Sequence, residues 1–198
     1  VYSNGARSGS DICVAFIAPD GDVQRVARFD VAERDECRTA VPSGERMLVA
    51  ADIVSTDSDT RGAWLCDLDS EANVVLSLAV TGDGACRPAD VSPFAAGGFV
   101  VAGSFDSEET ESTDCWVARF EDDGTPLWWT AWGGSDRDAA ASASVVTDGI
   151  LVYGTTRLTE TEGAALSLVK IDPDGEVIWA RVYDAPEERS EEHTSELQ

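Results

Sequence analysis

The sequence repeats about every 51 residues, and this period constrains the fold more than any other feature of the chain. The clearest marker is an acidic turn that ends in glycine or alanine. Its equivalent positions are Gly21, Ala72, Gly124 and Gly175, which are 51, 52 and 51 residues apart. The repeat divides the chain into units of residues 11–61, 62–113, 114–162 and, as a partial unit, 163–188.

Each unit is predicted to form four short strands. In the third unit the expected strands are residues 116–120, 127–132, 139–146 and 150–154, and an Asp-Asp-Gly turn joins the first two. Such a turn suits a tight hairpin, because glycine accepts a positive φ angle and aspartate bonds to its own backbone. Short strands between turn signals, without a helical period, indicate an all-β protein.

Four strands per unit and a period near 50 are typical of the blades of a β-propeller. Blades stack face to face, so both faces of each sheet must be apolar. Two repeat positions fit this requirement, one held by Ile17, Leu68, Phe120 and Ile171, the other by Val14, Leu65, Val117 and Leu168. We therefore predict about four consecutive four-stranded blades within residues 1–188, in a ring that is incomplete.

The third unit also carries a family resemblance. From Asp114 it reads D-x-W-V-A-R-F-x-x-D-G, then W-x-x-x-W-G-G, and ends in D-G-I-L-V-Y-G-T-T. This pattern resembles the β-propeller repeats of bacterial secreted and cell-surface proteins (the SBBP type). The first unit departs most, with Ser43-Gly44 where an Asp-Gly turn is expected. The resemblance implies a propeller and an extracytoplasmic location, but no particular reaction.

The net charge limits the partners. The chain has 14 basic and 38 acidic residues, for a net charge of −24. Such a surface repels nucleic-acid backbones and anionic lipid headgroups. No apolar run reaches the roughly 18–20 residues that span a bilayer, so direct membrane insertion is not expected. The expected partner is a protein or a glycan.

The last ten residues, 189–198, read Arg-Ser-Glu-Glu-His-Thr-Ser-Glu-Leu-Gln. They resemble the in-frame translation of a common sequencing adapter. We interpret them as a non-native tail that makes no packed contact with the blades.

No catalytic constellation stands out. The single histidine, His193, lies in the predicted tail, whereas a Ser-His-Asp or Cys-His arrangement needs a base near neutral pKa. The many acidic residues allow carboxylate pairs of the glycosidase type without pointing to any one pair. The sequence thus favours a module for binding or scaffolding. The alternative is part of an enzyme propeller, either a quinoprotein-like dehydrogenase dependent on pyrroloquinoline quinone or a glycan-active enzyme.

Tryptophans recur at fixed repeat positions, as Trp64 with Trp116 and Trp128 with Trp179. Such positions usually pack between blades. Quinoprotein propellers also carry one tryptophan per blade, but they add calcium ligands and an adjacent pair of cysteines. No Cys-Cys pair occurs here, so packing is favoured and no cofactor is predicted.

The acidic turns offer candidate calcium ligands, since calcium prefers hard oxygen donors. The candidates are Asp122, Asp123, Asp172 and Asp174. None belongs to a twelve-residue calcium loop, and ordinary turn formation explains the same residues.

The cysteines leave two alternatives open. Cys37 and Cys86 occur as Glu-Cys-Arg and Ala-Cys-Arg and are interpreted as repeat-equivalent. Disulfides Cys13–Cys37 and Cys66–Cys86 would then be similar links within a unit, leaving Cys115 unpaired. Buried free thiols are the other interpretation.

Overall fold

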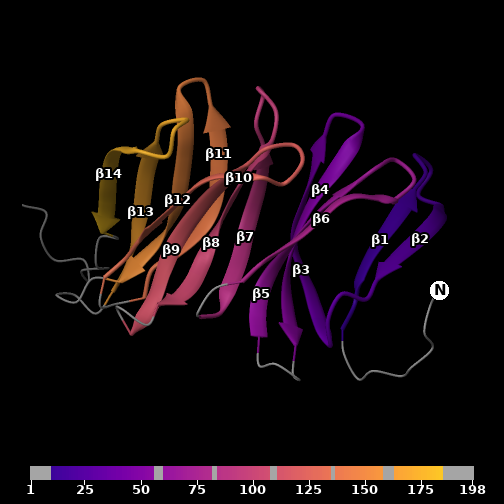
Figure 1. Ribbon diagram of the computed structural model, residues 1–198, viewed down its shortest axis with the longest axis horizontal. Helices are drawn as coiled ribbons and strands as arrows, with labels where there is room; N and C mark the ends of the chain where they lie inside the picture. The colour runs from indigo at the N-terminus through magenta and orange to yellow at the C-terminus, as the bar shows by residue number, and fades with distance from the viewer. Residues whose placement is uncertain are drawn as a thin grey trace, which may run out of the picture.

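A computed structural model of the chain describes residues 10–55, 60–81, 84–107, 111–134, 137–157 and 163–184. All regular structure in these ranges is antiparallel β (Figure 1). A helix long and apolar enough to cross a membrane is not found among the described residues. The predicted all-β class is confirmed.

The strands form one two-stranded and three four-stranded sheets in the described ranges. The two-stranded sheet pairs β1 (Ile12–Ile17) with β2 (Val23–Phe29). The next sheet holds β3 (Arg34–Ser43), β4 (Arg46–Ser55), β5 (Thr60–Leu68) and β6 (Val74–Val80). Then come β7 (Cys86–Pro93), β8 (Phe99–Ser107), β9 (Ser112–Phe120) and β10 (Pro126–Trp132). The last sheet holds β11 (Ala139–Val146), β12 (Gly149–Arg157), β13 (Ala164–Ile171) and β14 (Val177–Asp184).

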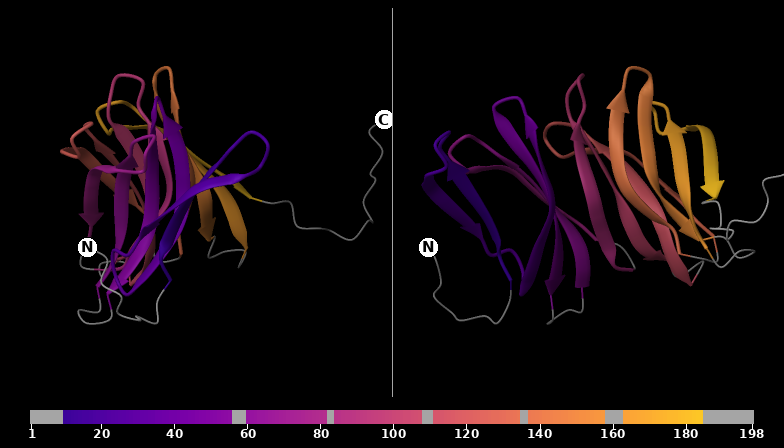
Figure 2. Two further views of the ribbon diagram at one scale, coloured as in Figure 1. Left: turned by 90° about the vertical axis from the view of Figure 1, so that its right-hand side faces the viewer. Right: turned by 180° about the vertical axis from the view of Figure 1, so that it is seen from behind.

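The sheets lie side by side in chain order, with their faces toward one another (Figures 1 and 2). Each four-stranded sheet is a meander in which neighbours in sequence are neighbours in space. The described sheets form an open series that does not close on itself, as predicted for an incomplete propeller-like fold.

The core consists of three apolar layers, one between each pair of successive sheets. Leu68 lies in the layer shared with the β1–β2 sheet, Phe120 in the next layer, and Val117 and Ile171 in the last. In the predicted apolar columns, Leu65, Leu68, Val117, Phe120 and Ile171 are therefore buried inside the series, and Val14 and Leu168 are half-buried. Ile17 belongs to the same repeat position but is 62% exposed, because no described sheet covers its side of β1.

The sheets are out of phase with the repeat units. The first unit, 11–61, supplies β1 and β2 to one sheet and β3 and β4 to the next. The partial unit 163–188 supplies β13 and β14, which complete the last sheet. The first strand β7 contacts both β3 and β11, the first strands of the neighbouring sheets, and the aromatic strand β10 lies at the far edge of its sheet.

Candidate functional site

A pocket of about 150 Å³ lies between the β3–β6 and β7–β10 sheets, near the ends of their strands. It is unusually rich in arginine. Four of the 14 basic residues of this acidic chain line it. The lining residues are Arg34, Glu36, Arg38, Asp52, Ile53, Val54, Arg61, Gly62, Cys86 and Arg87.

The register of the sheet explains why two of the arginines meet. Arg34 on β3 lies directly opposite Val54 on β4, and Val54 lies directly opposite Arg61 on β5. Residues directly opposite in antiparallel pairs project from the same face of a sheet. Both arginines therefore flank Val54 on the face that carries Ala63, which packs toward β7.

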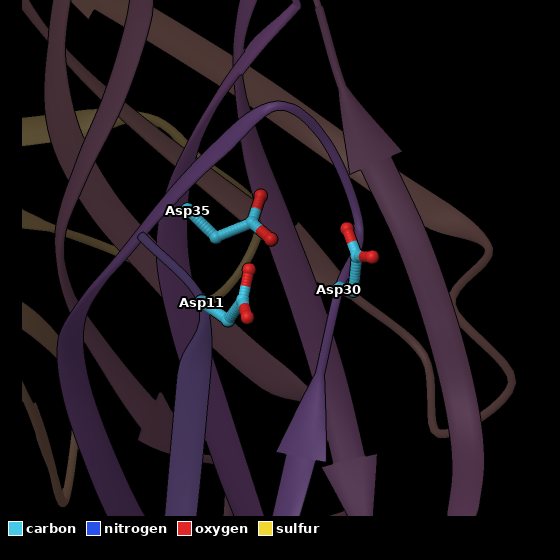
Figure 3. Close-up of side chains that lie close together, drawn as sticks. All are labelled: Asp11, Asp30 and Asp35. Atoms are coloured by element: carbon cyan, nitrogen blue, oxygen red, sulfur yellow. The ribbon is translucent and has the colours of Figure 1, made fainter. Parts of the chain in front are cut away.

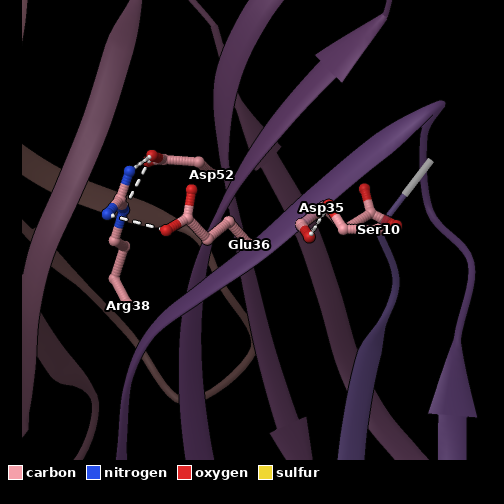
Figure 4. Close-up of polar contacts among 5 residues, drawn as sticks. All are labelled: Ser10, Asp35, Glu36, Arg38 and Asp52. Carbon is pink, nitrogen blue, oxygen red and sulfur yellow. Dashed lines mark hydrogen bonds and ion pairs between the residues drawn. The ribbon is translucent and has the colours of Figure 1, made fainter.

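Arg38 is held by two acidic side chains (Figure 4). Its Nε lies 2.7 Å from Asp52 Oδ2, and its Nη1 lies 3.2 Å from Glu36 Oε1. The hydrogen bond to Asp52 raises the pKa of Arg38. Asp52 Oδ1 is buried and has no hydrogen-bond partner among the described residues.

Arg87 is held by Asp106 in a two-pronged ion pair. Its Nη1 and Nη2 each donate to a different oxygen of that carboxylate, both at 2.9 Å. The Thr113 hydroxyl donates to the same carboxylate at 3.2 Å. The hydrogen bonds from Arg87 lower the pKa of Asp106 below its ordinary value and raise that of Arg87.

Arg34 and Arg61 differ from these two arginines. Both are exposed, and neither makes a side-chain hydrogen bond or ion pair within the part of the chain that the structure describes. A guanidinium group offers five N–H donors in a planar fork that matches a carboxylate or a phosphate. The pocket thus contains two arginines that are paired with acidic side chains, Arg38 and Arg87, and two that are open to a ligand.

The sequence did not indicate this pocket. Its arginines come from two strands of one sheet, β3 and β5, and from the first strand of the next sheet, so only the pairing of strands brings them together. The clustering of Arg34, Arg38, Arg61 and Arg87 within residues 34–87 was the one available signal.

A second group of side chains is acidic (Figure 3). Oxygens of Asp11, Asp30 and Asp35 lie within 4.8 Å of one another, and this spacing could hold a cation. Burial raises the pKa of Asp35, and the negative charges of Asp30 and Glu33 act in the same direction.

Two of the three carboxylates in this acidic group already have local roles. Asp35 accepts hydrogen bonds from the N–H groups of Val31 at 2.8 Å and Ala32 at 3.0 Å, so it caps the turn between β2 and β3. Asp11 is paired with Arg28. Its hydrogen bonds therefore make this cluster part of the fold between the first two sheets.

The predicted calcium candidates lie on two hairpin turns in different sheets. Asp122 accepts from the Gly98 N–H and Asp123 from the Thr125 N–H, each at 2.9 Å. Asp172 accepts from the N–H groups of Asp174 and Glu176, also at 2.9 Å. Asp123 and Asp172 thus stabilise their own turns, Asp122 bonds to the turn before β8, and the described structure does not gather the four candidates into one group. Calcium binding at these turns stays a prediction.

The interpretation of Cys37 and Cys86 as repeat-equivalent was wrong. Cys37 pairs with Ala51 just before a β-bulge, and the residue in that place in the next sheet is Pro88, which pairs with Gly103. Cys86 lies two residues earlier, in the place of Asp35. The two Cys-Arg dipeptides therefore lie two residues apart in the alignment of the repeats.

All five cysteines lie in described residues and are free thiols in the structure. Cys13 and Cys37 are exposed on strands of different sheets. Cys66 and Cys86 are buried in different apolar layers, on the two sides of the β3–β6 sheet. The disulfides Cys13–Cys37 and Cys66–Cys86 stay predictions, which the counting of reactive thiols tests.

The equivalent tryptophans of β5 and β9 pack between sheets. Trp64 and Trp116 are buried, and Trp116 stacks on Trp129 with ring centroids 4.7 Å apart. Trp128 reaches across to the last sheet, where its Nε1 donates to the Pro173 carbonyl at 2.9 Å. These contacts support the packing interpretation of Trp64, Trp116 and Trp128.

Comparison with models of known protein families gives no match to this chain, and comparison with curated proteins gives none either. The predicted tail, residues 189–198 with His193, lies outside the described residues.

Proposed function

We propose that this chain is a binding module built on a propeller-like repeat, and that the arginine pocket is its ligand site. The observation that carries this proposal is the meeting of four arginines in one pocket of a chain whose net charge is −24. Arg38 and Arg87 are neutralised by Asp52 and Asp106, which leaves Arg34 and Arg61 for an anionic group of a ligand.

The chemistry of the pocket supports binding rather than catalysis. Its candidate nucleophiles are the Cys86 thiol and the carboxylates of Glu36 and Asp52, and Arg38 donates hydrogen bonds to both carboxylates. Burial, with the nearby negative charge of Asp52, raises the pKa of this thiol to about 12. The thiolate is the reactive form of cysteine, so Cys86 is inert near neutral pH.

The setting of the module follows from the resemblance of its repeats. We propose that they are of the type found in bacterial secreted and cell-surface proteins, so that the module works outside the cytoplasm. The pattern from Asp114 to Thr156 and the series of four-stranded antiparallel sheets support this assignment. The ligand is then an acidic group on another protein or on a glycan.

The test is a binding screen on immobilised protein with peptides and oligosaccharides in matched acidic and neutral forms. The double variant Arg34→Gln/Arg61→Gln removes the two open arginines. Arg157→Gln is the matched control, since Arg157 is an exposed arginine at the end of a strand away from the pocket. We expect the wild type and the control to retain acidic ligands and the double variant to lose them.

Three results would overturn the proposal. The first is acidic-ligand binding that the double variant retains in full, and the second is the absence of any acidic-ligand binding to the wild type. The third is turnover of a redox dye after addition of pyrroloquinoline quinone and calcium, which would favour the enzyme alternative.

A further inference from the structure

We infer that the group held by Arg34 and Arg61 is the terminal carboxylate of a peptide chain whose last residue is aliphatic. This inference rests on the proposed function of the pocket and names its ligand class. Three properties of the pocket lead to it: the geometry of its donors, its charge, and the character of its remaining walls.

The donors suit one carboxylate. Arg34 and Arg61 are two strands apart across Val54, so their Cα atoms are separated by about 10 Å. Long side chains that start at this distance can converge on one group between them. The neighbouring pair shows the favoured geometry, because Arg87 binds both oxygens of the Asp106 carboxylate at 2.9 Å.

The charge of the site favours one negative charge over several. Glu36 and Asp52 line the pocket with the four arginines, so the lining is only mildly positive. At physiological salt, the electrostatic field of the protein is largely screened beyond the Debye length of about 8 Å. An anionic ligand that comes closer is repelled by the acidic surface around the pocket. A polyanionic chain would bring many charges against that surface, whereas a peptide terminus brings one.

The walls favour a peptide over a sugar acid. Val54 and the buried Cys86 supply apolar side chains of the lining, and none of the lining residues is aromatic, while the Ile53 side chain packs on the other face of the sheet. Sugar rings commonly pack on flat aromatic side chains, whereas an aliphatic side chain packs well on valine. A volume of about 150 Å³ suits one terminal residue. Capture of a chain-terminal carboxylate is also a recurring mode of peptide recognition.

The test uses the full chain and fluorescein-labelled pentapeptides of sequence Gly-Ser-Gly-Ser-X, where X is valine, leucine, isoleucine or serine. Each peptide is made as the free acid and as the C-terminal amide, and binding is measured by fluorescence polarisation. We expect an aliphatic free acid to bind at least about tenfold more tightly than its amide, because bonds between charged groups are lost in the amide. We expect Arg34→Gln and Arg61→Gln each to remove that preference and Arg157→Gln to keep it.

The outcomes separate this inference from the proposed function. Glucuronate or an oligoglucuronate that binds in an arginine-dependent way, with acid and amide peptides equal, would overturn the peptide inference and leave the binding proposal standing. Equal binding of acid and amide, or no peptide binding, overturns the inference by itself. If no acidic ligand of any kind binds in a way that depends on Arg34 and Arg61, both the inference and the proposed function are overturned. Thermal melts of each variant show whether it is folded.

Discussion

The carboxylate of Asp90 accepts a hydrogen bond from the hydroxyl of Ser142 and so joins the first strands of two successive sheets. The same carboxylate accepts from the Ala143 N–H at 3.1 Å and, on the other side, from the Thr39 hydroxyl at 3.5 Å. Thr39, Asp90 and Ser142 each follow the bulge in the first strand of their sheet. One repeat position therefore links three sheets that share no ladder of backbone hydrogen bonds.

This link predicts energetic coupling between the sheets. In a double-mutant cycle, Asp90→Ala and Ser142→Ala should show a coupling energy of about 0.5–1.5 kcal/mol, measured by urea unfolding. The coupling of Asp90→Ala with Thr39→Ala should be smaller, because 3.5 Å is long for a hydrogen bond between oxygens. Strict additivity of Asp90→Ala and Ser142→Ala would show that the contact contributes nothing to stability.

The stacked pair Trp116 and Trp129 predicts a strong asymmetry between two tryptophans. Trp116 is completely buried between sheets, whereas Trp129 is 47% exposed. Trp116→Ala should reduce the free energy of unfolding by about 3–5 kcal/mol, because it leaves a large cavity. Trp129→Ala should cost roughly 1–2 kcal/mol, from the lost stacking and its smaller buried area. Equal losses of unfolding free energy in chemical denaturation would contradict the deeper burial of Trp116.

Gly44 and Gly98 both have positive φ angles, so substituting each by alanine separates the cost of a steric clash from the cost of backbone strain. Gly98 has φ +75°, and a Cβ there would lie 2.0 Å from the Phe120 carbonyl oxygen. Gly44 has φ +63° with open space around it. Gly44→Ala should cost about 1 kcal/mol from backbone strain, and Gly98→Ala should cost roughly 1–3 kcal/mol more, because backbone must move. Similar melting temperatures for the two variants would show that the turn before β8 adapts freely.

The fold could be predicted because its signals are local and repeated. The turn at Gly124 and the apolar strand around Val117 recur every 51 or 52 residues, and both features fix strands without knowledge of distant contacts. The phase of the sheets could not be predicted in this way. The strand pattern is the same whether β3 and β4 join β1 and β2 or join β5 and β6, and only long-range pairing decides.

The arginine pocket could not be predicted from the sequence for the same reason. Arg34 and Arg61 are 27 residues apart and meet through the register of three strands, while Arg87 arrives from another sheet. A shift of one residue in that register would turn a side chain to the other face.

Thiol reactivity tests the state of the cysteines. Burial raises the pKa values of Cys66, Cys86 and Cys115 to about 12, so these thiols should not react with a thiol reagent at pH 8. Cys13 and Cys37 are exposed and should react, Cys37 more slowly because partial burial raises its pKa.

Colour development with an aromatic disulfide reagent should thus report two thiols in the native protein and five in denaturant without reductant. A count of one or three in denaturant would instead reveal disulfides and support the pairing predicted from the sequence.

The ion pair of Arg87 and Asp106 predicts a dependence of stability on pH. The pKa of Asp106 is lowered in the folded protein, chiefly by the hydrogen bonds from Arg87. The folded state therefore favours the charged carboxylate above the ordinary pKa of about 3.8, and this stabilisation is lost as the pH falls through the lower, folded value. The Asp106 side chain is 47% exposed and the Arg87 side chain 34%. Screening by solvent therefore keeps the contribution of this ion pair to stability near 1 kcal/mol or less.

Asp106→Asn should accordingly lower the free energy of unfolding by up to about 1 kcal/mol at pH 7, and the gap to the wild type should close as the pH falls through the lowered pKa of Asp106, because the wild-type carboxylate then becomes neutral as well. Arg87→Gln should behave in the same way, since it removes the other half of the pair. Urea unfolding at pH 7, 5 and below 3 measures these differences. A gap that is as large in acid as at pH 7 would mean that Asp106 stabilises the fold through packing or through the Thr113 hydrogen bond, and not through its charge.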